Sequence, residues 1–210
     1  GHGWTVNGEV PGQNLHTNPA TGNRYMAGVF DVVHDNGGRT GMYATKTKFN
    51  LFNYSYDGVN GAPDTTGADN GRDKIDNFVN VDHNSPSVLS SFLSDMAANP
   101  MDYAFVHFSE PDQYGHSNGW GSTAYMNSIK TVDGYLGQIF NLINTDARFT
   151  NNTVVIVTSD HGGAGTGHGD PTLALNYTIP FMVWGAGATP GAELYNMNGT
   201  TYLNPGTSRP

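Results

Sequence analysis

The sequence predicts an α/β fold with a mostly parallel sheet flanked by helices. Segments whose apolar residues recur at helical spacing alternate along the chain with short runs of β-branched and aromatic residues. This alternation is typical of folds in which helices cover the faces of a parallel sheet. The length of 210 residues suits one domain, so residues 1–210 are expected to form a single one.

Three segments are predicted to be helices because their apolar residues fall on one face. They are residues 25–36, 85–98 and 125–144. The first ends where Gly37 and Gly38 interrupt the pattern. The second is expected to begin with Ser85 as its N-cap and Pro86 as its first helical residue. The third is the longest and has the most regular apolar stripe.

Four segments are predicted to be strands, namely residues 39–45, 103–109, 153–158 and 179–184. The run TVVIVT at 153–158 is almost entirely β-branched, which predicts a central parallel strand buried on both faces. Residues 53–73 are rich in Gly, Asp, Asn and Thr, so they are interpreted as a long surface loop. Parallel sheets carry their chemistry beyond the carboxyl ends of the strands, so the residues that follow each strand are the candidates for a site.

The composition excludes several classes of protein. A charged fraction of 13% with 28 Gly and 23 Asn is not that of a coiled coil, a helical bundle or a charge-rich disordered chain. Nine basic against 18 acidic residues give a net charge of −9 without any basic cluster, so no nucleic-acid surface is predicted. No apolar run is long enough for a membrane span, and the absence of cysteine excludes disulfides and thiolate nucleophiles.

Two potential metal ligands follow the predicted strand at 103–109. Asp112 and His116 are four residues apart, so in a helical turn their side chains face the same point. A carboxylate together with an imidazole suits a cation such as zinc or manganese. The spacing Asp-x-x-x-His is common by chance, so the pair is informative only in combination with other ligands.

Three further potential ligands, Asp160, His161 and His168, follow the predicted strand at 153–158 among several glycines. Adjacent Asp and His side chains diverge on a regular strand, so they converge only where the glycine-rich backbone bends. The alternative is a glycine-rich turn in which Asp160 caps backbone amides. With Asp112 and His116, these residues are too many for one tetrahedral zinc with an open position, and they suit two cations about 4 Å apart.

The segments PDQYGHSNG (111–119) and VTSDHGGAGTGHG (157–169) resemble the alkaline phosphatase superfamily, and most closely its type I phosphodiesterase and nucleotide pyrophosphatase branch. The resemblance covers nearly the whole chain. It implies that Asp112, His116 and His168 hold one divalent cation and that Asp160 and His161 hold a second, with zinc or manganese as the metal. The opening GHGWTVN is also similar, which implies that Asn7 binds a phosphoryl oxygen; an Asn-Gly turn is the alternative.

The family's Ser or Thr nucleophile and its first metal-binding Asp lie upstream of the segment that the opening resembles. The chain is therefore expected to be a partial domain, incomplete at its N-terminus, and inactive or nearly so alone. The resemblance implies two-metal, in-line phosphoryl transfer on a small phosphate ester of phosphodiester or nucleotide pyrophosphate type. It also implies a periplasmic or secreted protein, whereas the oligomeric state stays open.

Other interpretations stay open beside this one. A sulfatase or phosphonate hydrolase of the same superfamily would differ in its nucleophile. A non-catalytic domain would bind metal without turnover, and a plain α/β domain would keep Asp112 far from Asp160.

The other histidines have structural interpretations at this point. His107 is expected to pack within its strand, and His16 to lie solvated in a loop. Lys46 and Lys48 are interpreted as a solvated loop end, with contact to an anionic substrate as the alternative.

Overall fold

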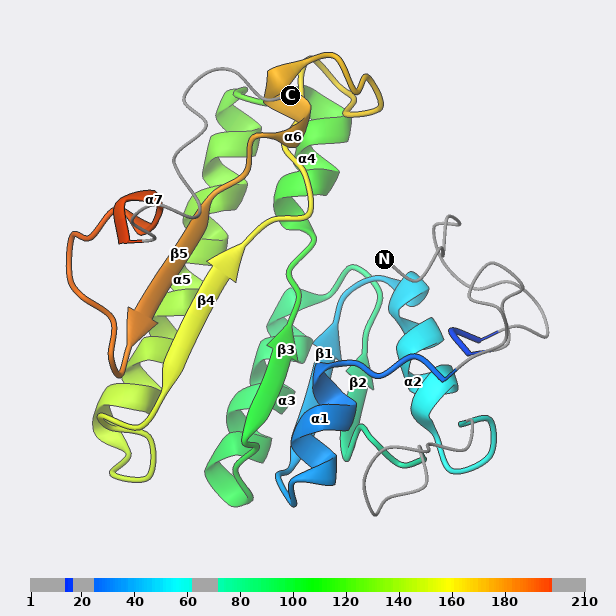
Figure 1. Cartoon of the computed structure of the whole chain (residues 1–210). Coiled ribbons are helices and arrows are strands. Elements are labelled where there is room, and N and C mark those ends of the chain that lie inside the picture. The colour runs from blue at the N-terminus through cyan, green and yellow to red at the C-terminus, as the bar shows by residue number, and fades with distance from the viewer. Residues whose placement is uncertain (1–13, 17–24, 62–71, 198–210) are drawn as a thin grey trace. The chain divides into compact units, whose positions relative to one another are not determined.

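The computed structural model describes residues 14–16, 25–61 and 72–197, and the chain divides into two compact units. Unit 1 runs from Gly1 to Gly137 and unit 2 from Gln138 to Pro210. Figure 1 shows the helices and strands of both units. The expectation of a single domain stays a prediction.

Unit 1 is built on a three-stranded parallel sheet with the strand order β2-β1-β3. The strands are β1 (Thr40–Ala44), β2 (Asn77–Asn80) and β3 (Tyr103–Val106). β1 is the central strand and is buried along its whole length, with α1 and α3 in contact with it. The strands predicted at 39–45 and 103–109 are confirmed with shorter bounds, whereas β2, with only two apolar residues in NFVN, was not predicted.

Helices α1 (Val29–Asp35) and α3 (Ser85–Ala98) pack on opposite faces of this sheet, as Figure 1 shows. The ring of Phe30 in α1 lies 5.1 Å from that of Tyr103, and the ring of Phe92 in α3 lies 5.3 Å from that of Tyr43. Tyr103 pairs with Thr40, three residues before Tyr43, so the two tyrosines point to opposite faces. The α/β fold with a parallel sheet flanked by helices is therefore confirmed.

The start of each of these helices differs from its prediction. α1 begins at Val29, four residues after the predicted start at Tyr25. In α3 the N-cap is Asn84, whose side chain accepts a hydrogen bond from the Ser87 N–H at 3.1 Å. The prediction of Ser85 as the cap is wrong because Asn is an equally good cap one residue earlier.

The loop predicted from residue 53 is also wrong over its first residues. A short 3₁₀ helix, η2 (Thr47–Phe49), leads into α2 (Asn50–Tyr56), which buries Leu51 and Tyr56 against Leu15. Residues 62–71 of the predicted loop lie outside the described residues.

His16 is buried in this small core and is only 2% exposed. Its Nδ1 accepts the N–H of Met26 at 3.0 Å, and its Nε2 lies 2.8 Å from the carbonyl oxygen of Ser55. The ring of Tyr25 stacks on it with centroids 4.6 Å apart. The prediction of a solvated His16 is therefore wrong, because both ring nitrogens have partners inside the protein.

Unit 2 contains a two-stranded antiparallel sheet of β4 (Val154–Thr158) and β5 (Phe181–Gly185). The short helices α6 (Ala174–Tyr177) and α7 (Leu194–Met197) flank β5 along the chain. The long helix α5 (Thr123–Thr145), predicted at 125–144, begins in unit 1 and ends in unit 2. None of the described helices is both long enough and apolar enough to cross a membrane.

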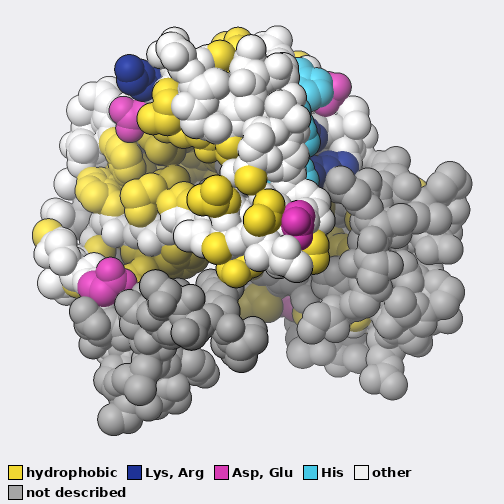
Figure 2. Space-filling model, turned by 90° about the horizontal axis from the view of Figure 1, so that it is seen from above, with side chains coloured by type: hydrophobic (Ala, Val, Ile, Leu, Met, Phe, Trp, Pro, Cys, Tyr) yellow, Lys and Arg dark blue, Asp and Glu magenta, His cyan; other side chains and the backbone are white. Residues whose placement is uncertain are grey.

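The prediction of β4 as a central parallel strand is wrong within the described part of unit 2. β4 pairs antiparallel with β5, and its Ile156 side chain is 57% exposed. One face of the pair packs on α5, where the Phe140 and Trp184 rings lie 4.8 Å apart. Figure 2 shows exposed hydrophobic side chains gathered on one surface of the molecule. A β-branched run thus predicted the strand but not its partner or its burial.

Candidate metal centre

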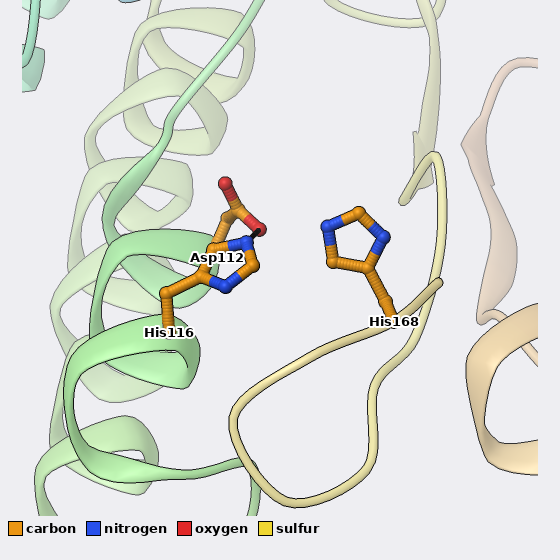
Figure 3. A group of neighbouring side chains, drawn as sticks. All are labelled: Asp112, His116 and His168. Carbon is orange, nitrogen blue, oxygen red and sulfur yellow. Dashed lines mark ion pairs between the residues drawn. The ribbon is translucent and has the colours of Figure 1, made fainter. Parts of the chain in front are cut away.

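In unit 1, Asp112 and His116 lie one turn apart on helix α4 (Glu110–Asn118), which begins four residues after the end of β3 at Val106. Pro111 stands in the first turn, where a missing N–H costs no hydrogen bond. Asp112 Oδ1 lies 3.3 Å from His116 Nε2. Figure 3 shows the two side chains together on α4, with their ion pair dashed, and also labels His168, which belongs to unit 2.

The spacing of these two atoms fits a cation. A zinc ion bound at about 2.0–2.1 Å by a carboxylate oxygen and an imidazole nitrogen, at the tetrahedral angle, holds them roughly 3.3 Å apart. Asp112 Oδ1 and His116 Nε2 already have a separation of 3.3 Å. The separation of the two atoms therefore matches that of two ligands of one zinc ion.

Lys46 forms an ion pair with the other carboxylate oxygen of Asp112, Oδ2. Lys46 follows β1 and α4 follows β3, and parallel neighbouring strands end at the same edge of a sheet, so the two residues meet there. The Lys46 and Asp112 side chains are 20% and 21% exposed. The prediction of Lys46 as a solvated loop end is therefore wrong.

Trp120 packs on the ligand pair of unit 1. Its ring meets that of His116 edge to face, with centroids 5.1 Å apart and planes at 83°. Gly115 permits this approach, because a Cβ there would lie 2.6 Å from Trp120 Cε2. The indole thus limits the positions open to the His116 imidazole.

Glu110 ties α4 to two other helices. Its carboxylate accepts hydrogen bonds from the Ser85 hydroxyl of α3 at 2.6 Å and from the Tyr135 hydroxyl of α5 at 3.4 Å. Burial and then the Glu110 charge raise the pKa of Tyr135, which keeps its hydroxyl a donor. Nothing in the sequence indicated that Glu110 would connect these helices, because each of its two partners is 25 residues away along the chain.

In unit 2, Asp160 and His161 follow β4 directly. Asp160 Oδ2 lies 3.4 Å from His161 Nε2, close to the spacing of the pair in unit 1. The chain leaves strand geometry at Ser159, so these adjacent side chains converge as the glycine-rich sequence predicted. Asp160 Oδ1 also accepts the His161 N–H at 3.2 Å, so the amide-capping role proposed as the alternative coexists with the pair.

The hydrogen bonding of His161 selects the nitrogen that could bind a metal. His161 Nδ1 lies 2.9 Å from the carbonyl oxygen of Gly162, which can only accept, so Nδ1 carries the hydrogen. In the neutral ring, Nε2 then keeps its lone pair on the side of Asp160. Metal-ligating histidines typically donate their other ring N–H to such an acceptor. His161 thus has the tautomer that a metal ligand needs.

Gly162 is fixed in place by a close backbone contact. Its N–H donates to the Asn176 carbonyl at 2.9 Å, and a Cβ at Gly162 would lie 2.1 Å from the Leu175 carbonyl oxygen. Only glycine fits there, so the loop after β4 is held against α6 and presents the Gly162 carbonyl to His161.

His168 lies beside His161, another candidate ligand of unit 2. Its ring stacks on that of His161, with centroids 3.6 Å apart and planes at 15°. A tight turn closed by the Ala164 N–H donating to the Gly167 carbonyl at 2.9 Å returns the chain to this point. Gly165 in that turn has φ +60°, a conformation that favours glycine.

The predicted ligands therefore fall into two groups, one in each unit. Asp112 and His116 lie together in unit 1, and unit 2 brings Asp160, His161 and His168 together. Asn7 lies outside the described residues. His107 packs as expected, with Nδ1 2.9 Å from Thr45 Oγ1.

Both a family profile and a curated protein match this chain. The sequence profile of the type I phosphodiesterase / nucleotide pyrophosphatase family matches residues 21–205. GPI ethanolamine phosphate transferase 1 of Schizosaccharomyces pombe is 31% identical over 84 residues, which is 40% of this chain and 9% of that protein.

Two solved structures are also similar. Murine ectonucleotide pyrophosphatase/phosphodiesterase 5, in an inactive form in complex with AMP, gives a TM-score of 0.44 at 21% identity, covering 67% of this chain and 35% of that one. Leishmania mexicana phosphoglycerate mutase, at low cobalt concentration, gives a TM-score of 0.50 at 17% identity, covering 77% of this chain and 32% of that one.

This chain spans about a third of the length of those two structures and about a tenth of the curated relative. The likeness to the mutase concerns the fold alone. The family profile covers most of the chain and includes all five predicted ligands. The chain belongs to the type I phosphodiesterase / nucleotide pyrophosphatase family of the alkaline phosphatase superfamily.

Proposed function

We propose that this chain supplies most of the metal ligands of a hydrolase that cleaves phosphate esters, of phosphodiester or nucleotide pyrophosphate type. Asp112, His116 and His168 are assigned to one divalent cation, and Asp160 and His161 to a second. Zinc suits these ligands best, with manganese as the alternative. The overall reaction adds water across a P–O bond and releases a phosphate monoester and an alcohol or second phosphate.

The observation that carries the proposal is the repeated carboxylate–imidazole pair. Each pair follows a strand, and the O–N distances are 3.3 Å for Asp112–His116 and 3.4 Å for Asp160–His161. Two such pairs in a chain of this family support a two-cation centre more strongly than either pair alone.

Each group has a distinct part in the proposed reaction. Bound cations would neutralise the charge that develops on the phosphoryl oxygens. Trp120 keeps His116 in position, and the Gly162 carbonyl keeps His161 in the ligand tautomer. The attacking hydroxyl is assigned to polypeptide outside this chain, and Asn7 to a phosphoryl oxygen.

The test is hydrolysis by the full-length protein that contains this chain, with and without a chelator. The substrates are bis-p-nitrophenyl phosphate, p-nitrophenyl phosphate and p-nitrophenyl sulfate. Fastest turnover of the diester, lost on chelation and restored by zinc or manganese, is expected. Preference for the sulfate would favour the sulfatase alternative, and chelator-insensitive activity or none at all would reject the hydrolase.

Two Asp→Asn variants test whether the activity depends on the proposed ligands. Asp112→Asn is expected to lower kcat/KM by more than about 100-fold, because it removes a ligand rather than a group that supports one. Asp133→Asn changes the same functional group on the exposed surface of α5 and is expected to leave kcat/KM unchanged. Equal activity of the two variants would contradict the assignment.

A further inference from the structure

We propose that Lys46 is a resident counter-ion of Asp112 that competes with the divalent cation and thereby lowers the metal affinity of this site. The inference rests on the proposed function, because it presumes that a cation binds to Asp112.

The Asp112 carboxylate is shared between two groups. The Lys46 ammonium pairs with Oδ2, while His116 Nε2 lies 3.3 Å from Oδ1. Both oxygens belong to one carboxylate, so a cation on the Oδ1 side would lie within a few ångströms of the ammonium. Lys46 must then either repel the cation or give up its contact with Asp112.

Lys46 is held at this position by its backbone. Its carbonyl oxygen accepts hydrogen bonds from the Asn80 side chain at 2.9 Å and from the Phe49 N–H at 3.1 Å. The preceding Thr45 is fully buried and bonds to His107 Nδ1 at 2.9 Å. The backbone from which the Lys46 side chain reaches Asp112 is therefore fixed at the end of β1.

The sign of the effect follows from comparing two contributions. Lys46 helps to hold the Asp112 carboxylate in one orientation, which favours binding by a small factor. Its positive charge repels a divalent cation, and this repulsion is strong because both side chains are largely removed from water. Repulsion is the larger contribution, so removing the charge is expected to tighten metal binding.

A purely structural role predicts the opposite result. If the ion pair only ties the end of β1 to α4, its loss would free the Asp112 side chain and leave metal affinity unchanged or weaker.

Lys48 offers a matched control two residues along the chain. Its ammonium lies 6.0 Å from the centroid of the Phe49 ring. Lys48→Met removes the same charge as Lys46→Met, so it accounts for any general effect of net charge on cation binding.

The experiment is a calorimetric zinc titration of the full-length protein that contains this chain, after its metal has been removed. A competing chelator brings sites of high zinc affinity into the measurable range. Lys46→Met is expected to bind zinc at least about tenfold more tightly at the site that Asp112→Asn removes. The zinc affinity of Lys48→Met should stay within about twofold of that of the original protein. Lys48 does not pair with the Asp112 carboxylate, so solvent and salt screen the effect of its charge on the cation. Lys46→Gln gives the same test with a polar side chain should Lys46→Met not fold.

Thermal unfolding provides a second measurement. The rise in Tm on adding zinc should be larger in Lys46→Met than in the original chain, because tighter binding stabilises the folded state more. Unchanged or weaker zinc binding in both Lys46 variants would overturn this inference while leaving the proposed function intact. Zinc binding that does not depend on Asp112 would overturn both.

Discussion

The Nδ1 hydrogen of His161 is donated to the carbonyl oxygen of Gly162, the next residue, at 2.9 Å. This short local bond presents Nε2 towards Asp160. Its geometry depends on the Gly162 backbone, which α6 holds through the Asn176 carbonyl. The backbone of Gly162 therefore determines which nitrogen of His161 would be open to a cation.

Gly162→Ala is expected to disturb this arrangement. The new Cβ would lie 2.1 Å from the Leu175 carbonyl oxygen, so the loop must move away from α6. Such overpacking costs about 1–3 kcal/mol of unfolding free energy, and zinc affinity at the Asp160 site should fall by about tenfold or more. Gly169→Ala is the control, since its Cβ meets nothing within 4 Å. Equal zinc affinity in the two variants would show that the Gly162 contact does not position His161.

Gly115→Ala tests the role of Trp120 in the same way. A Cβ there would lie 2.6 Å from the indole, which must leave its place against His116. We expect zinc affinity at the Asp112 site to fall by about 10-fold to 100-fold, as for other groups that orient a ligand. If calorimetry gives the original affinity, the indole does not orient the imidazole.

Gly137→Ala is the same type of substitution, but it is expected to stabilise the protein. Gly137 lies inside α5, where an added Cβ meets no atom within 4 Å. Alanine should raise the free energy of unfolding by about 0.5–1 kcal/mol through helix propensity. Urea unfolding measures this gain, and zinc affinity should not change.

Lys74→Met is expected to be strongly destabilising. Lys74 is fully buried, with its ammonium 2.5 Å from Asp35 and 3.5 Å from Asp31. Removing the positive charge leaves two carboxylates together inside unit 1, which costs about 3–5 kcal/mol. Lys130→Met on the exposed surface of α5 should change stability by less than about 0.5 kcal/mol. A similar urea midpoint for the two variants would contradict the buried network.

Alkaline pH is expected to unfold the protein because of its buried tyrosines. Burial and then the Asp31 charge raise the pKa of Tyr56, and burial and then the hydrogen bond to Asp95 raise the pKa of Tyr43. In the unfolded chain both ionise near pH 10. Their contribution to stability is therefore complete below about pH 10 and is lost above it, by roughly 1.4 kcal/mol per pH unit for each tyrosine.

Tyr56→Phe tests this pH dependence. It removes one ionisable group, so its stability should fall less steeply above pH 10 than that of the original chain. At neutral pH it loses the 2.5 Å hydrogen bond to the Met26 carbonyl, at a cost of about 0.5–1.5 kcal/mol. Tyr54→Phe on an exposed position of α2 should leave the slope unchanged. If the free energy of unfolding fell with the same slope above pH 10 in the original chain, Tyr56→Phe and Tyr54→Phe, ionisation of Tyr56 would not be a cause of alkaline unfolding.

Local patterns in the sequence predicted much of the fold and the proximity of the candidate ligands within each pair. The sequence placed Asp112 beside His116 because helical spacing brings residues four apart onto one face. It placed Asp160 beside His161 because glycines allow the backbone to bend after a strand. These arrangements depend on a few neighbouring residues, so the sequence alone contains the information.

Arrangements that depend on distant residues could not be predicted in this way. Lys46 meets Asp112 across 66 positions, because β1 and β3 are neighbours in the sheet. His16 is buried because residues from α2 close around it. β4 has the composition of a central strand, but its antiparallel pairing with β5 depends on the return of the chain through α6.

Zinc content tests the central claim most directly. The full-length protein that contains this chain is freed of metal, loaded with excess zinc, dialysed, and analysed by elemental mass spectrometry beside its Asp112→Asn and Asp160→Asn variants. The account predicts two zinc ions per chain, falling to one in each variant. No bound zinc in the original chain, or two ions in both variants, would contradict it.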